Sequence, residues 1–439
     1  MPPSEQRLTE HSYYAATAPR TQHFPALAGE HTTDVCVIGG GLAGLSAAIE
    51  LAQRGFAVTV LEARQVGWGA SGRNGGQALV GLACEIEVVA DVLGRSIARR
   101  IFDLSVDGLA LIHSRCSAFG IDCDWQPGML HAAIGARKGR ALHAWCDAMA
   151  RAYGYPLQAI GRADVRGWID SPRYAAAAYD GTSGHLHPLK YTLGLARAAD
   201  ALGVKIHEQS PAQALVHDPA HPTARAPLVV TPAGRVRSAH VLLAGGVYLD
   251  GLAARPAARI MPVGTFIAAS APLSRARAEA LIPSRAAVSD TNFVLDYFRL
   301  AADHRMIFGG RVSYSTIVPP QLPQAMRRRM VRVFPQLSDV VVDYAWGGYV
   351  DITMNRAPDF GRLDREGWPD AYVVQGFSGH GLALTGIAGM LAAEAIAGTA
   401  ERFDLFSRMP HRPFPGGRLL RTPALVLAMA WYRMRDLLG

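Results

Sequence analysis

The fold of this chain is decided by residues 34–62, which read DVCVIGGGLAGLSAAIELAQRGFAVTVLE. The apolar run 35–38 predicts a buried strand, residues 45–54 carry apolar side chains at helical spacing, and residues 56–61 predict a second strand. Gly55 follows the predicted helix, where a C-terminal glycine is common. The stretch therefore predicts a strand, a glycine turn, a helix and a second strand that ends at Glu62.

The glycines of this turn have mechanical reasons to be there. Gly39 permits the tight turn, Gly41 lets a pyrophosphate approach the backbone, and Gly44 lets the helix pack closely on the strand. The helix N-terminus offers free N–H groups and a partial positive charge to phosphates. Glu62 lies 18 residues after Gly44, where a carboxylate can accept hydrogen bonds from a ribose hydroxyl. Together these features predict a dinucleotide-binding unit rather than an ordinary strand–helix turn.

Two further glycine-rich segments accompany this unit. Residues 67–77 read GWGASGRNGGQ, which disfavours the interior of a helix or strand and favours backbone packed against a flat or phosphorylated ligand over a flexible surface loop. Residues 375–381 read QGFSGHG and stand between a predicted strand at 372–374 and a predicted helix at 382–397. The second of these repeats the order strand, glycine turn, helix, but it does not make a second complete nucleotide fold.

The rest of the chain mixes helices and strands. Residues 85–166 are expected to be mostly helical, with apolar spacing at 97–111 and 141–149, and further helices are expected at 189–202 and 319–334. Strands are expected at 204–207, 228–230, 236–246, 263–270, 292–300, 306–312 and 340–349. The fold class is therefore α/β.

Composition excludes several classes of protein. The chain has 439 residues, half of them apolar and 18% charged, which suits one or two domains with a large core and not a disordered, collagen-like or coiled-coil chain. The formal net charge is +8, but no run of five basic residues predicts a nucleic-acid tail. The five cysteines form no CxxC pair, which favours a reduced protein over a zinc or redox protein.

No segment predicts a membrane span. Residues 1–34 are polar and lack the apolar core of a signal peptide, and no window approaches the ~20 apolar residues that a spanning helix needs. We therefore expect a cytoplasmic protein without an integral membrane segment. Residues 408–439 mix arginines with large apolar side chains, so this tail is expected either to dock on the fold or to lie on a membrane and reach a quinone.

Several segments carry a resemblance to a known family. They are residues 12–17 (SYYAAT), 67–77, 184–191 (GHLHPLKY), 262–266 (PVGTF), 295–300 (LDYFRL), 308–310 (FGG), 346–348 (WGG) and 414–421. With them the sequence resembles the D-amino-acid oxidase-like superfamily of FAD-dependent oxidoreductases, and within it the γ-glutamylputrescine oxidoreductase group. The resemblance spans almost the whole chain.

The resemblance implies an FAD-binding Rossmann-like domain into which a β-rich substrate domain is inserted. On this basis residues 1–33 form an N-terminal extension, residues 34–84, 181–250 and 355–400 form the FAD-binding domain, residues 85–180 and 251–354 form the substrate domain, and residues 401–439 form a C-terminal tail. It implies FAD contacts from Gly39, Gly41, Gly44, Glu62, Ala63, Arg64, Ser71, Arg73, Asn74, Gly75, Gly76, Gln77, Ala212, Gly245, Gly376, Phe377, Gly379, His380 and Gly381.

Two departures from sarcosine oxidases of this superfamily bear on the chemistry. Those enzymes bind the flavin covalently through a cysteine near the positions of Gly347 and Gly348, but no cysteine follows Cys146 here, so the FAD is expected to be non-covalent. They also place a lysine over the flavin, and no lysine follows Lys205. The electron acceptor is accordingly left open between dioxygen and a quinone.

The reaction implied is oxidation of a C–N bond in an amine or amino acid, with a hydride passing to the flavin and the imine hydrolysed by water. We expect Tyr297, Trp346 and His380 near the substrate, the two aromatic rings forming a cage for the amine by cation–π contact, although each could equally pack in the core. Arg299 and Arg311 are candidates for binding a substrate carboxylate.

Several alternatives stay open. The substrate could be a cyclic or N-methylated amino acid such as pipecolate or sarcosine in place of γ-glutamylputrescine. A nicotinamide-dependent dehydrogenase, or a flavin-binding tRNA-modification or assembly factor, would share the turn at residues 39–44. His185 and His187 stand two apart, but no third ligand is close to them in the sequence, so no metal site is expected.

Overall fold

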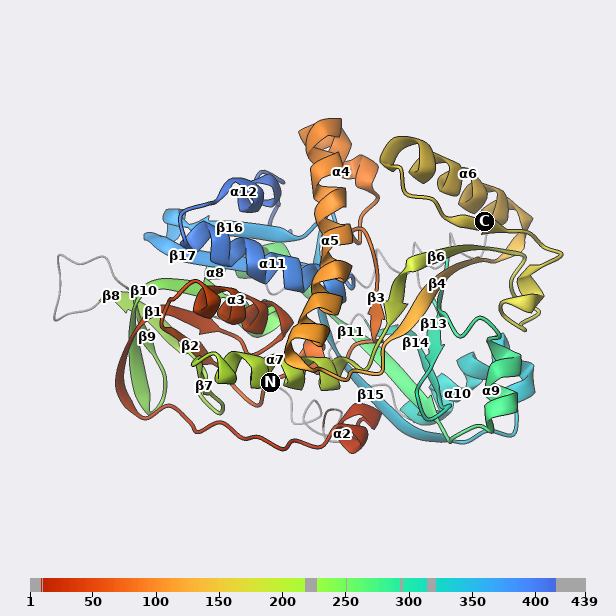
Figure 1. Ribbon diagram of the computed structural model, residues 1–439, viewed down its shortest axis with the longest axis horizontal. Helices are drawn as coiled ribbons and strands as arrows, with labels where there is room; N and C mark the ends of the chain where they lie inside the picture. The colour runs from red at the N-terminus through yellow and green to blue at the C-terminus, as the bar shows by residue number, and fades with distance from the viewer. Residues whose placement is uncertain are drawn as a thin grey trace.

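Two β-sheets of different character organise the molecule (Figure 1). We describe them from a computed structural model, in which the described residues are 9, 11–217, 227–249, 251–292, 295–313 and 321–415, with the side chains of 311–313 left aside. The C-terminal tail beyond residue 415 and the side chain of Arg311 therefore lie outside the described part of the chain.

The first sheet is mainly parallel. Its strand order is β16 (Asp359–Leu363), β17 (Trp368–Gln375), β10 (Gly234–Leu243), β1 (Gly29–Ile38), β2 (Val58–Leu61) and β7 (Lys205–His207). Strands β17, β10, β1, β2 and β7 run parallel to one another, while β16 is antiparallel to β17. The hairpin of β8 (Ala214–His217) and β9 (Pro227–Val230) extends the sheet from β10.

The two faces of this sheet bury alternate residues of β1, because successive side chains of a strand point to opposite faces. Val35 and Val37 pack toward the helices α3 (Leu42–Gln53), α5 (Arg95–Phe119), α7 (Pro188–Ala201), α11 (Gly381–Ile396) and α12 (Glu401–Ser407). Cys36 and Ile38 join the core on the opposite face, with side chains from β9 and β10. The predicted strand–turn–helix–strand unit is thus the centre of the sheet, and it is confirmed.

The second sheet is almost wholly antiparallel. Its order is β15 (Val342–Thr353), β11 (Ile260–Ser270), β14 (Met306–Ser313), β13 (Tyr297–Leu300), β12 (Ala287–Asp290), β4 (Gln126–Ala133), β6 (Ala176–His185) and β3 (Gln77–Ala78), with β5 (Gln158–Ile160) on β6. Only the β12–β4 pair is parallel among the pairings of these described strands. Helices α9 (Arg275–Leu281) and α10 (Leu322–Val333) cover one face, and α6 (Gly135–Tyr153) packs on β4 and β6.

The prediction that residues 85–166 are mostly helical is confirmed, but it did not include two strands. Helices α4 (Ile86–Leu93), α5 and α6 lie there, but β4 and β5 interrupt them. Strand β4 pairs with β12 on one side and β6 on the other, so contacts distant in sequence fix its conformation against the weak local pattern. The strand expected at 292–300 covers only 297–300 of its described residues, whereas the other expected elements are present with slightly different ends.

The predicted domain boundaries stay a prediction. Strand β3 and the end of β6 belong to the antiparallel sheet, although both fall within ranges assigned to the cofactor domain. Two short helices lie outside the parts described so far. Helix α2 (Tyr13–Thr17) precedes β1, and helix α8 (Ala254–Arg259) precedes β11.

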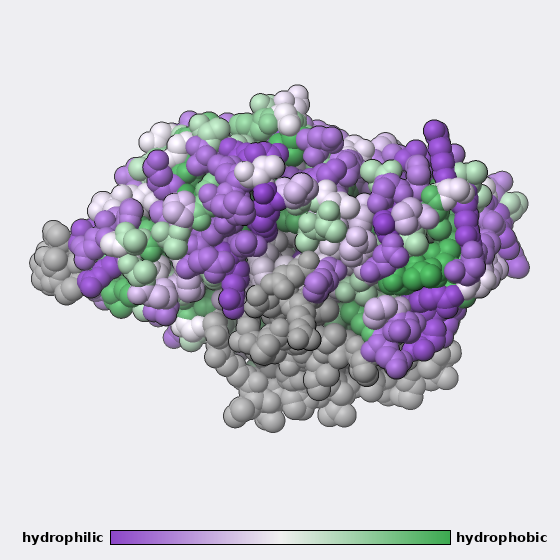
Figure 2. All heavy atoms as spheres, turned by 90° about the horizontal axis from the view of Figure 1, so that it is seen from below, coloured by the Kyte–Doolittle hydropathy of each residue, from purple (hydrophilic) through white to green (hydrophobic). Residues whose placement is uncertain are grey.

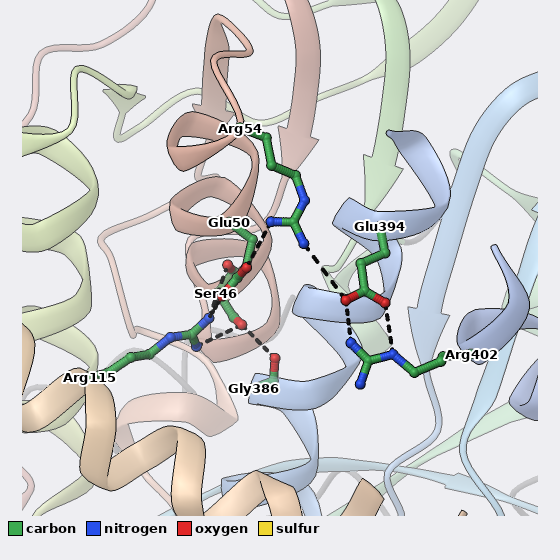
Figure 3. A network of polar contacts seen from close by, with 7 residues as sticks. All are labelled: Ser46, Glu50, Arg54, Arg115, Gly386, Glu394 and Arg402. Carbon is green, nitrogen blue, oxygen red and sulfur yellow. Dashed lines mark hydrogen bonds and ion pairs between the residues drawn. The ribbon is translucent and has the colours of Figure 1, made fainter. Parts of the chain in front are cut away.

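Helices α3 and α11 are joined with their backbones in close contact. A Cβ atom on Gly389 would lie 2.4 Å from the carbonyl oxygen of Ala43, so only glycine permits this approach. Figure 3 shows the polar contacts beside it: the Ser46 hydroxyl donates to the Gly386 carbonyl at 2.5 Å, and the Arg115 guanidinium of α5 donates to Ser46 Oγ at 2.7 Å. The nucleotide-binding helix is therefore held by α5 and by α11.

Figure 2 shows a face on which hydrophilic residues predominate, with hydrophobic areas at several places, one of them at the end that holds the antiparallel sheet. Among the described residues no single helix has both the length and the apolar character needed to cross a membrane, and one pair, α11 with α12, meets the criterion only together and with a bend of 120°.

Candidate functional site

A cavity of about 570 Å³ opens where the parallel strands end. Its wall includes Ile38 at the end of β1, Leu61 at the end of β2, and residues 244–246 just after β10. Ligands of open parallel sheets bind at this edge, outside the carboxyl ends of the strands. Of the predicted cofactor residues, nine line the cavity: Gly39, Gly41, Glu62, Ala63, Arg64, Ser71, Ala212, Gly245 and Phe377.

The turn between β1 and α3 accepts only glycine at its key positions. Gly39 has φ +118°, and a Cβ there would lie 2.8 Å from the Ala244 carbonyl oxygen. A Cβ on Gly41 would lie 2.7 Å from Ser71 Oγ, and one on Gly44 would lie 2.0 Å from the Gly39 carbonyl oxygen. Bare backbone therefore faces the cavity at Gly39 and Gly41, while Gly44 lies behind the turn and lets α3 approach β1.

Ser71 links the second glycine-rich segment to this turn. Its hydroxyl oxygen accepts the backbone N–H of Leu42 at 3.0 Å, which satisfies one donor at the N-terminus of α3. Ser71 and residues 67–70 line the cavity beside Gly41. The two segments predicted to hold one ligand are thus neighbours in space.

Glu62 bridges the turn and the segment after β2. One carboxylate oxygen accepts the N–H of Gly40 at 2.8 Å, and the other accepts the N–H of Arg64 at 2.8 Å. Burial raises the pKa of the Glu62 carboxyl above its ordinary value, against these two hydrogen bonds, which lower it. A carboxylate held in this way at the end of β2 is placed as a ribose-binding acid must be.

Arg73 is enclosed between the glycine-rich segment and β15. Its guanidinium donates to the Gly347 carbonyl at 3.0 Å and to the Tyr248 hydroxyl at 2.8 Å, and it lies 4.6 Å from the centre of the Trp68 ring. The residue is 4% exposed and does not line the 570 Å³ cavity, but it lines a neighbouring cavity of about 420 Å³ on the other side of Trp68. Arg73 thus connects the segment after β10 of the parallel sheet to β15 of the antiparallel sheet.

The second half of the glycine-rich segment turns away from the cavity. The Asn74 side chain donates to the carbonyls of Ala70 and Ser71 at 3.0 Å each and accepts the N–H of Gly76 at 2.8 Å. The Gln77 side chain donates to the Val288 carbonyl on β12 of the antiparallel sheet at 3.0 Å. Asn74, Gly75, Gly76 and Gln77 are not among the residues that line either cavity.

The turn before α11 meets the cavity through Phe377, and an acid from β15 holds it. Asp351 lines the cavity, and its carboxylate accepts the N–H of Gly376 at 2.6 Å. Burial raises the pKa of Asp351 to about 6. Gly376 and Gly379 have φ of +76° and +94°, so the tight turn depends on glycine.

His380 stands at the N-cap of α11. It is partly exposed, and its backbone N–H donates to the Phe377 carbonyl at 2.9 Å. Burial, with smaller contributions from Arg356 and His131, lowers the pKa of His380 to about 4. The imidazole is therefore neutral at pH 7, and neither His380 nor its neighbours Gly379 and Gly381 line the two cavities.

The predicted aromatic cage is not assembled as a pair of open faces. Trp346 is fully buried, donates from its indole nitrogen to the Arg73 carbonyl at 3.0 Å, and meets Tyr14 edge to face at 5.1 Å. Tyr297 is partly exposed and packs on Gly75, where a Cβ would lie 2.7 Å from the ring. Their contact with an amine stays a prediction.

Arg299 is engaged within the protein. It is 4% exposed, and its guanidinium donates to the Gly75 carbonyl at 2.8 Å and to the Tyr14 hydroxyl at 3.1 Å. Here it fixes the glycine-rich segment on the antiparallel sheet. Carboxylate binding by Arg299 or Arg311 stays a prediction.

His187 has a structural partner on each ring nitrogen. Nδ1 accepts the N–H of Lys190 and caps α7, at 3.2 Å, and Nε2 lies 3.0 Å from Thr17 Oγ1. His185 Nε2 lies 3.1 Å from the Arg285 carbonyl. In the described part of the chain no three histidine, cysteine or acidic side chains gather as a metal site.

Sequence reasoning missed the far wall of the cavity. It consists of Tyr248, which follows β10, Tyr349 and Asp351 on β15, and Thr385 on α11. A glycine pair precedes Tyr248 and was a usable signal, but Tyr349 and Asp351 lie in a strand whose local sequence carries no sign of a ligand.

The residues of the cavity fit a dinucleotide. Cβ-free backbone at Gly39 and Gly41, the N-terminus of α3 and a fixed carboxylate at the end of β2 provide the contacts that a pyrophosphate and a ribose need. Tyr349 and Asp351 belong to β15, so the wall of the cavity reaches from the parallel sheet to the antiparallel sheet.

Comparison with curated proteins finds relatives that match the full length of this chain. It is 40% identical over 436 residues to the γ-glutamylputrescine oxidoreductase of Escherichia coli strain K12, which covers 98% of this chain and 100% of the relative. It is 38% identical over 433 residues to the probable oxidoreductase OrdL of Haemophilus influenzae, covering 97% of each.

Solved structures share the fold at low sequence identity. The glycine oxidase of Geobacillus kaustophilus matches 87% of this chain and 100% of its own with a TM-score of 0.72 and 20% identity. The L-amino acid deaminase of Proteus myxofaciens matches 86% and 93% with a TM-score of 0.69 and 20% identity. These matches show a D-amino-acid oxidase-like fold with a Rossmann-like cofactor half.

The model of the family described as "FAD dependent oxidoreductase" matches residues 34–395, which begin at the first strand of the cofactor sheet and end in α11. FAD is the cofactor that this family uses, and the glycine turn, Glu62 and the cavity described above suit it. The chain therefore belongs to the FAD-dependent oxidoreductase family and is an enzyme of that class.

Proposed function

We propose that this enzyme oxidises the C–N bond of an amine of the γ-glutamylputrescine type. The support is the 40% identity to a γ-glutamylputrescine oxidoreductase over its full length, together with a cofactor cavity that continues to the substrate sheet at Tyr349 and Asp351. Bound FAD supplies a ring that takes a hydride from the carbon next to nitrogen, and water hydrolyses the imine that results.

The protein's own residues orient the partners and set the charge. Glu62 and the N-terminus of α3 would hold the ribose and pyrophosphate, and the positive N-terminal end of α11 would stabilise negative charge on the reduced flavin. His380 is neutral at pH 7, because burial lowers its pKa to about 4, so it adds no positive charge against an amine substrate. We propose that His380 and Tyr297 face the substrate. We propose that Trp346 acts through Arg73, whose carbonyl accepts the indole N–H of Trp346.

We propose that FAD is held without a covalent bond. Free thiols are present at Cys36, Cys84, Cys116, Cys123 and Cys146, and none of them lines either described cavity. Precipitation of the holoenzyme with acid should leave FAD in the supernatant and colourless protein in the pellet. A yellow pellet would contradict non-covalent binding.

Anaerobic reduction of the flavin tests the substrate. γ-Glutamylputrescine, putrescine, sarcosine and pipecolate are added in turn to the oxidised holoenzyme without air, and the loss of flavin absorbance is followed. We expect the fastest bleaching with γ-glutamylputrescine. Faster bleaching by sarcosine or pipecolate would replace the proposed substrate with an N-methyl or cyclic amino acid.

The same reduced enzyme identifies the electron acceptor, which we leave between dioxygen and a quinone. Readmission of air is compared with addition of a water-soluble quinone without air. Reoxidation within the turnover time by air makes the enzyme an oxidase, whereas reoxidation only by the quinone makes it a dehydrogenase.

A further inference from the structure

Two thiols meet at the end of the long helix α5, away from the cofactor cavity. Cys116 Sγ lies 3.6 Å from Cys123 Sγ. Cys116 belongs to the last turn of α5 and is partly exposed, whereas Cys123 is 2% exposed. Neither residue lines the cofactor cavity, and the proposed function uses neither.

The backbone fixes this contact. Gly120 ends α5 in the left-handed region with φ +60°, and the N–H of Ile121 returns to the Cys116 carbonyl at 2.9 Å. The following residues are anchored on α7, since the Cys123 carbonyl accepts the N–H of His187 at 2.7 Å and Asp124 binds Lys190 Nζ at 2.9 Å. Hydrogen bonds before and after the loop therefore fix the backbone at Cys116 and at Cys123, and this keeps the two sulfur atoms close to each other.

The environment distinguishes the two sulfur atoms. The hydrogen bond from the Cys123 thiol lowers the pKa of Cys116, and the same contact and burial raise the pKa of Cys123. The more exposed sulfur is thus the one that carries negative charge more readily, and the thiolate is the reactive form of cysteine.

We propose that Cys116 and Cys123 are an oxidation site at which hydrogen peroxide forms a reversible intrachain disulfide. The Cys116 thiolate attacks one peroxide oxygen, the O–O bond breaks, and the leaving hydroxide takes a proton to become water, which leaves a sulfenic acid on Cys116. The Cys123 sulfur then attacks the Cys116 sulfur, the S–S bond forms, the S–O bond breaks, and a second water leaves. The two thiols lose two electrons in all, and peroxide gains them.

The disulfide would require a short approach of the two sulfur atoms, and it would link α5 to the loop that follows it. The distance between the two sulfur atoms must shorten from 3.6 Å to about 2.05 Å. Cys116 lies in the last turn of α5, and Cys123 lies in the loop that follows this helix. The bond would join the last turn of α5 to the loop anchored on α7. Arg115, the residue before Cys116, is the side chain that holds Ser46 and Glu50 of the nucleotide-binding helix (Figure 3).

Peptide mass spectrometry of the holoenzyme tests the proposal. The protein is treated with a small excess of hydrogen peroxide, remaining thiols are blocked, and the digest is analysed without reductant. A tryptic digest keeps both cysteines on one peptide, since residues 116–123 contain no lysine or arginine. We expect this peptide to be unalkylated at both cysteines and lighter by two hydrogen atoms than its dithiol form, and we expect dithiothreitol to restore that mass.

Variants separate this site from general oxidation. Cys123→Ser should stop the reaction at a sulfenic acid on Cys116, which dimedone captures, and Cys116→Ser should leave Cys123 unmodified. The matched control is Cys146→Ser, which removes a different buried free thiol. This variant should still form the disulfide between Cys116 and Cys123. The proposal is overturned if Cys116 and Cys123 remain separately alkylated after peroxide treatment, or if Cys116 proceeds to sulfinic acid without cross-linking.

Discussion

Gly44 shows at the scale of one residue how the cofactor turn excludes a side chain. Its missing Cβ would lie 2.0 Å from the Gly39 carbonyl oxygen, and Gly389 of α11 packs closely on the same helix at Ala43, Ser46 and Ala47, which restricts its movement. Overpacking in a core costs about 1–3 kcal/mol. Here the atom in the way is backbone, which has less freedom to yield than a side chain.

Gly44→Ala should therefore lower the free energy of unfolding by about 3 kcal/mol and abolish FAD binding. Denaturant unfolding and the ratio of flavin to protein absorbance measure the two effects. Gly161→Ala is the matched control, because its Cβ would meet no heavy atom within 4 Å. A yellow Gly44→Ala variant of normal stability would show that the turn is not the site of the cofactor.

His187 couples the stability of the protein to pH. Its Nδ1 accepts the Lys190 N–H, and Thr17 uses its hydroxyl hydrogen on the Tyr13 carbonyl at 2.7 Å, so His187 must donate from Nε2 and be neutral. Burial, then the charges of Arg299 and Lys190, lower its pKa from 6.5 to about 3. The unfolded chain thus binds a proton near pH 6 that the folded chain does not.

It follows that the contribution of His187 to stability is complete above pH 6.5 and is lost as the pH falls from 6.5 toward 3. His187→Asn keeps a capping side chain without the titration, so its unfolding free energy should fall less than that of the parent between pH 7 and pH 5. Exposed His11→Gln should show the parent's pH dependence. Parallel pH curves for His187→Asn and the parent would refute this assignment.

Residue-level prediction from the sequence found residues that line the cavity where the pattern is local, while their contacts with a cofactor stay a prediction. Gly39, Gly41 and Glu62 could be found because strand, turn and helix adjoin in the sequence. Asp351 could not, because its neighbour in space, Gly376, is 25 residues away and nothing in the strand around it marks a ligand. Burial likewise cannot be read from residue type: Trp346 is fully buried, and its contact with an amine stays a prediction.

At the scale of secondary-structure elements, the contact of α3 with α5 and α11 sets the geometry of the site. Arg115 is a buried cation, with 4% of its side chain exposed, and it bonds to Ser46 and Glu50. Figure 3 shows a second arginine, Arg402, bonded to Glu394 at the far side of α11, where 39% of the arginine side chain is exposed. The two arginines differ chiefly in burial.

Arg115→Met should lower the free energy of unfolding by about 2 kcal/mol, because the Ser46 and Glu50 oxygens lose a buried donor. It should also weaken FAD binding, since α3 loses its contact with α5. Arg402→Met is the control and should cost less than about 1 kcal/mol, as for an exposed ion pair. Chemical denaturation and FAD titration of the apoprotein measure both. Equal effects of the two substitutions would argue against a special role for Arg115.

Prediction of elements failed where pairing partners are far apart. The glycine-flanked helices at 42–53 and 381–396 have local signals, and both were found. Strand β4 was missed because its partners lie at 176–185 and 287–290, and a short apolar run between two helices looks the same in a strand or a helix.

At the scale of the whole molecule, the cofactor cavity joins distant parts of the chain. Its wall combines residues from the segments 38–43, 209–212 and 244–249 with Tyr349, Asp351, Val374, Phe377 and Thr385. A ligand that fills such a cavity stabilises every element around it, because it binds the folded state alone.

FAD at 100 times its dissociation constant should therefore raise the unfolding free energy of the apoprotein by about 2.7 kcal/mol. FMN, which lacks the adenosine, and ADP, which lacks the flavin, should each need a higher concentration for the same rise in Tm. Differential scanning fluorimetry of the apoprotein compares the three. Equal protection by ADP and FAD would mean that the flavin end makes no contact with the protein.

The close approach of α3 and α11 has a consequence for biosynthesis. The N-terminal strand β1 finds its neighbour β10 only after residue 243 has been made, and α3 finds α11 only after residue 396. During translation the glycine turn therefore leaves the ribosome long before the partners that shape it, and this half of the enzyme reaches its native state only after α11 has been made. A chain whose synthesis stops before α11 would leave the α11-binding face of α3 exposed, and chaperones and proteases would recognise this face.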